Sequence, residues 1–301
     1  DAVFATGSIP PYTWSELRYP QEHPYCPNSI DMAFAITTEE VNKPKWCQGP
    51  DLSYNGVDVR ASEPLILADD FNCNETTRIT DITVWGSWNG DILPLKGAQD
   101  VQFTLSIHSD IPDPDPADPI NYSMPGEVLW YKVFMPGTFE VSIEKAGIEE
   151  GWWDPETLLY LFPGDTVCWK YVFRIPKTEA FCQRGTPEKP VVYWLDVQAD
   201  PNDVSGGAEF GWKSSINHWN DDAVWAVGSE PYAGTWQELR YPPGHPLQMQ
   251  SIDLAFAIDG NIPCCQRYTD FDSSGKVDVV DLSEFSGDCL WLGTAGGVEP
   301  D

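Results

Sequence analysis

The strongest chemical signal in the sequence is a run of oxygen-bearing side chains, YTDFDSSGKVDVVDLSEF (268–285). This run fits a twelve-residue calcium-binding loop, in which ligands recur at positions 1, 3, 5, 7, 9 and 12 and a glycine at position 6 allows a sharp turn. Gly275 stands at position 6, and Val277 is the apolar anchor at position 8. The expected ligands of one Ca²⁺ ion are Asp270, Asp272, Ser274, Lys276 through its carbonyl oxygen, Asp278 and Asp281.

This run resembles the first half of a bacterial dockerin, D-x-[DN]-x-[DS]-G-x-[VI]-[DN]-x-x-D-L, which has Asp at position 12 where ordinary EF-hands have Glu. Dockerins normally carry two such loops, and this sequence carries one. The resemblance implies a calcium-locked cap, in which residues 282–292 follow the loop as a short helix. We expect a disulfide between Cys289 and either Cys264 or Cys265 to hold this cap.

The cysteine pattern favours disulfides over a metal cluster. The chain has eight cysteines without any C-x-x-C spacing, and its four histidines are scattered. Zinc clusters usually need such close pairs. We therefore expect at least two disulfides in an exported protein. Eight cysteines allow 105 connectivities, so the sequence leaves the pairing open.

Adjacent acidic residues suggest a second cation site. Asp69 and Asp70 in LADDF, with Asn55 and Asp58 nearby in the sequence, offer the oxygen ligands that calcium prefers. Two interpretations stay open: a calcium site at the start of a strand, or a solvated turn. The two acidic residues of HWNDDAVW (218–225) are open to the same two interpretations.

Searches for catalytic motifs are negative. GSWNG (86–90) is not a nucleophile elbow because its serine is not central, and neither HExxH nor a phosphate-binding loop occurs. His108 and His218 lie beside acidic residues, where we expect hydrogen-bonded structural histidines. A pair of glycosidase carboxylates cannot be proposed without geometry. We therefore expect that the protein is not an enzyme.

The composition restricts the possible partners and the location. Acidic residues outnumber basic ones by 47 to 17, which gives a formal net charge of −30. Such a chain repels phosphate backbones and anionic membranes, so we expect no nucleic-acid partner. No stretch of about 18 apolar residues occurs, so we expect no membrane span. DAVFATGSIPPYTW has no features of a signal peptide, and we expect any such peptide to have been removed.

Short β-type runs carry most of these residues. β-Branched and aromatic residues alternate or cluster in six segments, each bounded by Gly, Pro, Asn or Asp. The expected strands lie at 79–88, 101–109, 127–134, 138–143, 166–175 and 190–199. The sequence therefore predicts an all-β fold, a β-sandwich or jelly roll of Ig-like type.

The most informative pattern is an internal duplication. Residues 1–36 and residues 222–258 are identical at 23 of 36 aligned positions, with one residue inserted before Thr235. The first copy ends in SIDMAFAI, a β-type segment that is not stable as a lone strand in water. Its apolar residues at alternate positions are Ile30, Met32, Phe34 and Ile36.

The first copy therefore needs a sheet to join. Three places are open: its own sandwich, a preceding domain, or the sandwich of a neighbouring subunit. Donation to a neighbour suits an orphan strand that has a sheet pattern of its own. In this respect the chain resembles the subunits of bacterial extracellular fibrils built by donor-strand exchange. That resemblance implies self-assembly with other copies of the chain.

The larger part of the chain, roughly residues 50–260, resembles an uncharacterised family of secreted bacterial β-sandwich domains. The segments that carry this resemblance include YNGVDVR, LILADDF, ITDITVWGSW, FTLSIHSDIP, FPGDTVCW, YWLDVQA and FGWKSSINHWNDDAVW. The resemblance implies a fold and an extracellular or cell-surface location in a bacterium. It implies no particular activity.

These observations predict four regions: an N-terminal arm (1–40), a linker (41–56), a β-sandwich (57–260) and a calcium-binding module (261–301). The expected function is that of a structural subunit of a secreted, calcium-stabilised fibre, in which the arm of one copy joins the sandwich of a neighbour. The alternative is a secreted carbohydrate-binding or dockerin-borne accessory module that binds polysaccharide.

Overall fold

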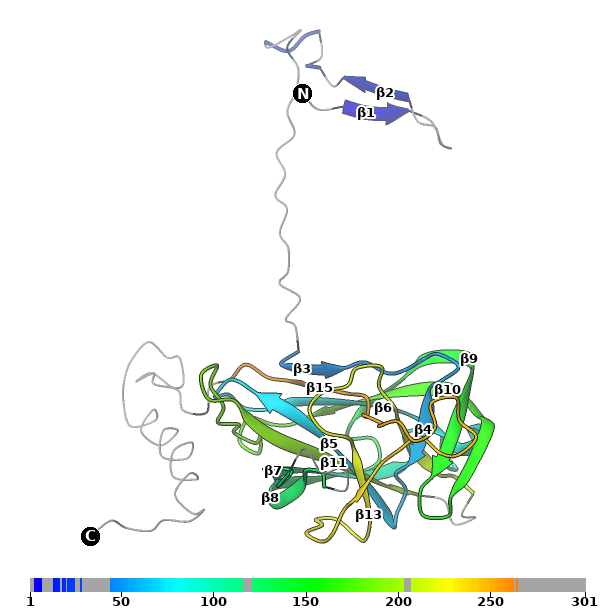
Figure 1. Ribbon diagram of the computed structural model, residues 1–301. Coiled ribbons are helices and arrows are strands. Elements are labelled where there is room, and N and C mark those ends of the chain that lie inside the picture. Colours follow the sequence, from blue (N-terminus) through cyan, green and yellow to red (C-terminus); the bar gives the residue numbers. More distant parts are fainter. Residues whose placement is uncertain are drawn as a thin grey trace, which may run out of the picture. The chain divides into compact units, whose positions relative to one another are not determined.

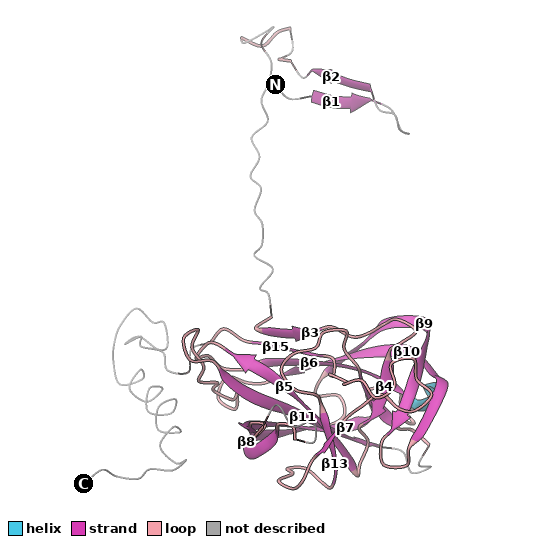
Figure 2. Ribbon diagram, in the orientation of Figure 1, coloured by secondary structure: helices cyan, strands magenta, loops and turns pink. Residues whose placement is uncertain are grey.

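The computed structural model describes residues 3–6, 13–16, 18–19, 21–24, 28, 44–115, 121–202, 207–262 and 264. The chain divides into two compact units, Asp1–Lys43 and Pro44–Asp301, and each is described by itself. The described part of the second unit consists of two β-sheets, so the predicted all-β sandwich is confirmed (Figures 1 and 2). Helical structure among the described residues is limited to one 3-10 turn, Asn89–Asp91.

One sheet has seven strands and the other has six. The seven-stranded sheet has the order β10 (Leu159–Arg174), β9 (Glu140–Asp154), β4 (Val57–Arg60), β12 (Phe210–Lys213), β6 (Asp81–Trp88), β15 (Phe256–Asp259) and β3 (Trp46–Gln48). The six-stranded sheet has the order β14 (Gln237–Glu238), β13 (Val224–Val227), β5 (Leu65–Cys73), β11 (Val191–Pro201), β7 (Val101–Ile111) and β8 (Met124–Phe134).

The six strands predicted from β-type runs correspond to β6–β11. Alternation along β8 leaves Leu129, Tyr131 and Val133 exposed, while Trp130 and Phe134 are buried. The central strand β11 is buried on both faces because Tyr232 and Trp236 and their neighbours cover the outer face of its sheet. Strand burial therefore follows the period of two only at the edge of this sheet.

The main core lies between the two sheets and is rich in aromatic rings. Phe103 of β7 is at its centre, with ring centroids 5.1 Å from Tyr171, 5.3 Å from Phe173 and 5.0 Å from Phe210. These rings come from strands of both sheets and meet edge-on, an arrangement that aromatic pairs favour. Aromatic contacts thus hold the sandwich together across its interior.

Five strands of the larger sheet close into a ring. β10 pairs with β9 through one part of its length and with β6 through another. β9 pairs in parallel with β4, which pairs with β12, and β12 in turn pairs with β6. Because the ring is closed, strands surround its inner side around the whole circumference.

Residues 222–259 complete both sheets, and we call them the closing segment. β13 and β14 form a hairpin in which β13 pairs with β5 at the edge of the six-stranded sheet. The segment then crosses to the other sheet, where β15 inserts between β6 and β3. Four apolar side chains of this crossing are fully buried: Ile252, Leu254, Phe256 and Ile258.

The sandwich begins earlier than the sequence suggested. Residues 41–56 were expected to be a linker, but β3 already pairs with β15. Gln48 is buried and donates a hydrogen bond from Nε2 to Asp69 Oδ2 at 3.1 Å. The prediction of a linker is therefore wrong for residues 46–48, which form a strand of the sandwich. This strand covers the edge of β15, which would otherwise be open.

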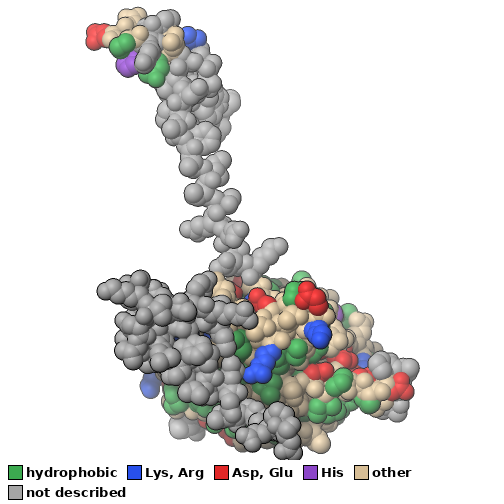
Figure 3. Space-filling view, turned by 90° about the vertical axis from the view of Figure 1, so that its left-hand side faces the viewer, with side chains coloured by type: hydrophobic (Ala, Val, Ile, Leu, Met, Phe, Trp, Pro, Cys, Tyr) green, Lys and Arg blue, Asp and Glu red, His purple; other side chains and the backbone are tan. Residues whose placement is uncertain are grey.

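In the first unit, the described residues include β1 (Val3–Thr6) and β2 (Thr13–Glu16), which form an antiparallel hairpin. None of the helices in the described part of the chain is long and apolar enough to cross a membrane. On the face of the sandwich shown in Figure 3, acidic and basic side chains are interspersed with apolar ones.

Candidate functional site

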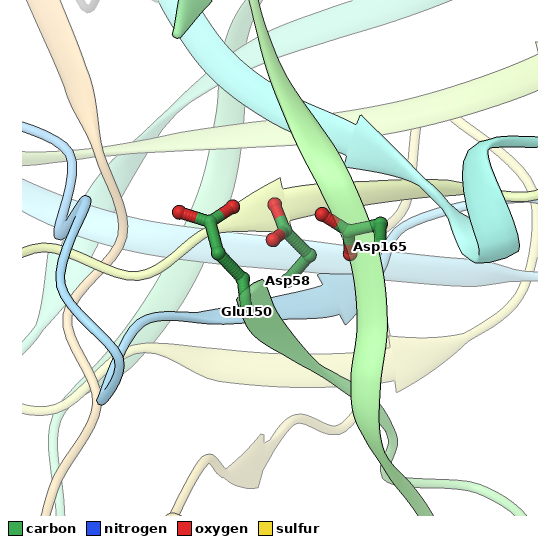
Figure 4. A group of neighbouring side chains, drawn as sticks. All are labelled: Asp58, Glu150 and Asp165. Atoms are coloured by element: carbon green, nitrogen blue, oxygen red, sulfur yellow. The ribbon is translucent and has the colours of Figure 1, made fainter. Parts of the chain in front are cut away.

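Three carboxylates meet inside the strand ring. Asp58 comes from β4, Glu150 from β9 and Asp165 from β10, and one oxygen of each lies within 4.8 Å of the others. Glu150 and Asp165 are opposite each other in the β9–β10 pairing. Figure 4 shows the three carboxylates side by side, with Asp58 between the other two. All three residues are buried.

A fully buried lysine partly neutralises these carboxylates. Lys213 Nζ donates a hydrogen bond to Asp58 Oδ2 at 3.0 Å and lies 2.7 Å from Glu150 Oε2. Strand alternation brings these side chains together, because Val57 and Val59 face the core and leave Asp58 on the opposite face. The same alternation in β12 places Trp212 in the core and Lys213 opposite it.

Burial controls the protonation of this cluster. Desolvation, reinforced by the nearby Asp58 carboxylate, raises the pKa of Glu150 to about 8 and that of Asp165 to about 9. Burial by itself would lower the pKa of Lys213, but Asp58 and Glu150 raise it above its usual value. The ammonium group therefore stays charged, and burial disfavours having all three carboxylates ionised without a further cation.

In the part of the chain that the structure describes, this is the one group of three acidic, His or Cys side chains with spacing suited to a metal ion. The residues are inaccessible to a substrate, because the exposed fraction of Asp58 and Glu150 is 0% and that of Asp165 is 2%. Carboxylate oxygens without nitrogen or sulfur partners suit a hard cation such as calcium or magnesium. The arrangement can therefore hold an ion and has no access for catalysis.

The structure separates Asp69 and Asp70, which the sequence had suggested as one calcium site. Asp69 accepts hydrogen bonds from Gln48 Nε2 and from the backbone N–H of Leu254, at 3.1 and 2.6 Å. Asp70, the next residue along β5, instead accepts a hydrogen bond from Asn220 Nδ2 at 2.5 Å. Consecutive strand residues point to opposite faces, so this pair does not hold one ion between its side chains.

The other acidic residues considered with them are also apart. Asp58 belongs to the cluster in the strand ring. Asp221 accepts a hydrogen bond from Ser123, and Asp222 lies 3.6 Å from Arg240. Burial raises the pKa of Asp70 to about 8, and Asp253 and Asp221 add to this effect.

The buried histidine His108 makes structural hydrogen bonds. Its Nε2 lies 2.6 Å from Asp196 Oδ2, and its Nδ1 lies 3.1 Å from the carbonyl oxygen of Gly126. Asp196 also accepts the backbone N–H of Ser106 at 2.8 Å. Both ring nitrogens are thus used to tie β7 to β11 and β8. His218 is half exposed and lies 3.4 Å from Asp253.

The structure corrects one disulfide expectation. Cys264 was expected as one of two partners for Cys289, but it is bonded to Cys182, with a Cα–Cα distance of 5.5 Å. Among the described cysteines, Cys47, Cys73 and Cys168 are free thiols. Cys265 and Cys289 lie outside the described residues, so a bond between them stays a prediction. The loop ligands 270–281 and the arm residues 30–36 also lie outside the described residues.

The two copies of the duplicated sequence fold alike where both are described. In the β1–β2 hairpin, Val3 pairs with Glu16. In the β13–β14 hairpin, the aligned residues Val224 and Glu238 form the same pair. The two hairpins therefore have the same register, and their sequence identity corresponds to a shared backbone arrangement.

The similarity continues beyond the hairpin. The rings of Tyr19 and His23 are stacked with centroids 4.4 Å apart, and the aligned rings of Tyr241 and His245 are stacked at 4.5 Å. In each copy the tyrosine N–H donates to the carbonyl oxygen nine residues later, at 3.1 and 3.0 Å. In the sandwich, His245 Nε2 also lies 3.1 Å from the carbonyl oxygen of Asn55. Where they are described, the residues between Val3 and Asn28 thus have the local structure of a closing segment.

The fold and these features define a β-sandwich domain with a buried carboxylate–lysine cluster and a duplicated closing segment. Residues 44–259 match the model of a domain of unknown function, DUF7901, and the chain belongs to that family. No curated protein and no solved structure matches the chain.

Sequence reasoning missed most of the carboxylate cluster. Asp58 was considered only as a neighbour of Asp69, and Glu150, Asp165 and Lys213 were not considered. One signal was available: Asp58 and Lys213 are charged residues that alternate with Val or Trp within short apolar runs. The same alternation is typical of a strand with one face in water, so it does not distinguish a buried cluster from a solvated surface.

Proposed function

We propose that the protein is a structural subunit of a secreted, calcium-stabilised fibre, in which residues 1–36 close a neighbouring sandwich of the same family. One observation carries the proposal: the β1–β2 hairpin has the register of the β13–β14 hairpin, which closes the sandwich of this chain. A segment that folds like a closing segment has the chemistry to occupy the same place in another sandwich.

The energy for such an association comes from the crossing strand. In the sandwich, Ile252, Leu254, Phe256 and Ile258 are fully buried, and the arm has Ile30, Met32, Phe34 and Ile36 at the aligned positions. Burial of each such side chain contributes about 1.5–3 kcal/mol before the entropy of ordering the arm is subtracted. Pairing with β6 and β3 would add backbone hydrogen bonds on both sides of the strand.

The closing segment of a folded sandwich competes with the arm of a neighbour. It is tethered to its own sandwich, which gives it an effective concentration on the order of millimolar. A neighbouring arm therefore has access mainly while a sandwich is still folding and its position between β6 and β3 is open. We propose that the subunits join at this stage.

Three further features belong to the proposal. The excess of acidic residues and the disulfide between Cys182 and Cys264 favour an extracellular location. The loop at 270–281 provides the ligand pattern for stabilising calcium. We propose no catalytic role, since the clustered carboxylates and the His108–Asp196 pair are buried.

The experiment compares the protein with a Phe34→Asp variant. We expect freshly folded parent protein to contain species larger than a monomer by gel filtration with light scattering, and fibres by electron microscopy. The variant should be monomeric with an unchanged melting temperature. Ile143→Asp on β9 is the matched control, because it changes an apolar residue that is 55% exposed on the sandwich surface. Multimers that persist in Phe34→Asp would contradict the proposal.

A second candidate is polysaccharide binding, which a groove beside β8 favours. The groove has a volume of about 760 Å³, and its lining includes Leu129, Tyr131, Lys132, Glu179 and Pro231. Tyr131 is 54% exposed, so its ring is free to stack on a sugar. Binding to insoluble polysaccharides that is lost in Tyr131→Ala and retained in Phe34→Asp would support this function instead.

A further inference from the structure

The oxygens of the carboxylate cluster fall into two sets. Lys213 lies within ion-pair distance of one oxygen of Asp58 and one of Glu150. The remaining oxygens accept no hydrogen bond of normal geometry from any residue in the described part of the chain. They are Asp58 Oδ1, Glu150 Oε1 and both oxygens of Asp165. Buried polar atoms without partners are rare because each costs about 1–3 kcal/mol.

A fully buried hydroxyl group points at the same place. Ser87 of β6 has an exposed fraction of 0%, and its Oγ has no hydrogen bond of normal geometry within the described residues. Burial raises the pKa of both Asp58 and Asp165, and a smaller opposing contribution from the Ser87 hydroxyl places this group beside both carboxyls. Five buried oxygens from four strands of the ring therefore lack hydrogen-bond partners within the described residues, and the three carboxylates among these groups lie close together.

We propose that this cluster binds one Ca²⁺ ion, held by Asp58, Glu150, Asp165 and Ser87. Calcium takes 6–8 oxygen ligands at about 2.3–2.6 Å, so two of its ligands can be nearly 5 Å apart. One oxygen atom of each of the three carboxylates lies within 4.8 Å of those of the other two, which is close enough for all three to bind one Ca²⁺ ion. Magnesium demands a tighter octahedron, with ligands at about 2.0–2.1 Å.

The formal charges support a divalent ion. Three ionised carboxylates and one ammonium group leave two negative charges in a site without solvent. A buried net charge of that size is unfavourable, and one Ca²⁺ ion cancels it. Lys213 cancels only one of the three negative charges, so two remain for the ion to neutralise.

Two glycines leave room for the charged groups. A Cβ atom on Gly56 would lie 2.8 Å from Lys213 Nζ, and one on Gly211 would lie 2.9 Å from Asp58 Cβ. Neither glycine could carry a larger side chain without moving this cluster. The site uses none of the residues of the loop at 270–281 and does not depend on the fibre proposal.

The test counts calcium in the full-length chain. A background variant, Asp270→Ala, removes a first ligand of the loop at 270–281. This chain is unfolded with EDTA, refolded with Ca²⁺, desalted and analysed by mass spectrometry of the metal. We expect one Ca²⁺ per chain in the background variant and none after the added change Asp165→Asn. A background variant without calcium, or equal calcium after Asp165→Asn, would overturn the proposal.

A matched control and a milder variant keep the result interpretable. Asp69→Asn changes a buried carboxylate outside the cluster, and we expect it to retain one Ca²⁺ per chain. Loss of calcium from this control would overturn the assignment to the cluster. If Asp165→Asn fails to fold by circular dichroism, Ser87→Ala is used, with an expected loss of affinity of at least threefold. Unchanged affinity would overturn the five-oxygen site.

Discussion

Asp69 Oδ2 accepts the backbone N–H of Leu254 at 2.6 Å, which joins β5 of one sheet to the closing segment. The same oxygen accepts a hydrogen bond at 3.1 Å from Nε2 of Gln48, the last residue of β3, which pairs with β15. A single buried carboxylate therefore attaches the first and last parts of the sandwich to the middle of the other sheet. Its role is structural and depends on its hydrogen-bond partners.

Replacing Asp69 by Ala should destabilise the sandwich strongly. The change leaves the Leu254 N–H and the Gln48 amide without partners, at about 1–3 kcal/mol for each buried group. Asp70→Ala is the matched control, since the one side chain that donates to Asp70, the amide of Asn220, is exposed and can bond to water instead. Urea unfolding should give a clearly lower free energy for Asp69→Ala than for Asp70→Ala. Equal values would refute this role of Asp69.

The two copies of the duplicated phenylalanine should respond differently to truncation. Phe256 is fully buried and packs against Phe71 and Trp212, so Phe256→Ala should cost about 3–5 kcal/mol of sandwich stability. The aligned change, Phe34→Ala, should leave the melting temperature of the monomer unchanged. Scanning calorimetry of both variants checks this, and equal losses would show that Phe34 supports the sandwich of its own chain.

Asp270→Ala should lower the melting temperature only when calcium is present. The parent loop gains stability from bound calcium by mass action, and the variant lacks a ligand at position 1. Thermal unfolding across a calcium titration, followed by fluorescence, provides the measurement. Curves that coincide at every calcium concentration would rule out a calcium-binding loop at 270–281.

The pH dependence of stability should change in Glu230→Gln. Burial, and then the nearby Asp196, raise the pKa of Glu230 to about 9, whereas an unfolded glutamate has a pKa of about 4.3. Between these two pKa values the folded protein keeps a proton on Glu230 that the unfolded protein releases. The free energy of unfolding of the parent therefore decreases as the pH rises from about 4 to about 9. Glutamine does not ionise, so Glu230→Gln does not lose stability in this way.

We therefore expect the stability of Glu230→Gln relative to the parent to increase between pH 5 and pH 8. The glutamine keeps an oxygen for the Ser106 hydroxyl, which donates to Glu230 Oε2 at 2.9 Å. Urea midpoints at the two pH values provide the comparison. A constant difference between the two proteins would show that Glu230 titrates normally.

The disulfide between Cys182 and Cys264 should contribute measurably to stability. It joins residues 82 positions apart, so its removal frees a long stretch of the unfolded chain. Replacing both cysteines by serine should cost about 2–4 kcal/mol. A non-reduced peptide map should contain the linked pair, and its absence from protein isolated under oxidising conditions would contradict the pairing.

Much of the fold follows from local patterns in the sequence. The runs that became β6–β11 combine β-branched and aromatic residues between turn formers, so each strand was recognisable by itself. The repeat also identified the closing segment, because SIDLAFAI alternates as a strand should. The short strand β3 was missed, because three residues in a proline- and glycine-containing stretch carry no periodicity.

The carboxylate cluster depends on pairings that no local pattern contains. Asp58 and Lys213 are 155 positions apart, and they meet because β12 lies between β4 and β6. Glu150 and Asp165 join them only because β9 pairs in parallel with β4. The partner of Cys264 was unpredictable for a similar reason, since eight cysteines pair according to the fold and not according to their spacing.

The pairing of β3 with β15 also determines when the domain can fold. Trp46 and Ile258 are partners in adjacent strands, although they lie at opposite ends of the family domain. A ribosome delivers Ile258 after the other strands of this sheet, so the larger sheet cannot be completed until the whole domain has been made, and closing so long a loop makes folding slow. We expect the newly made chain to remain open at this edge until translation of the domain has ended.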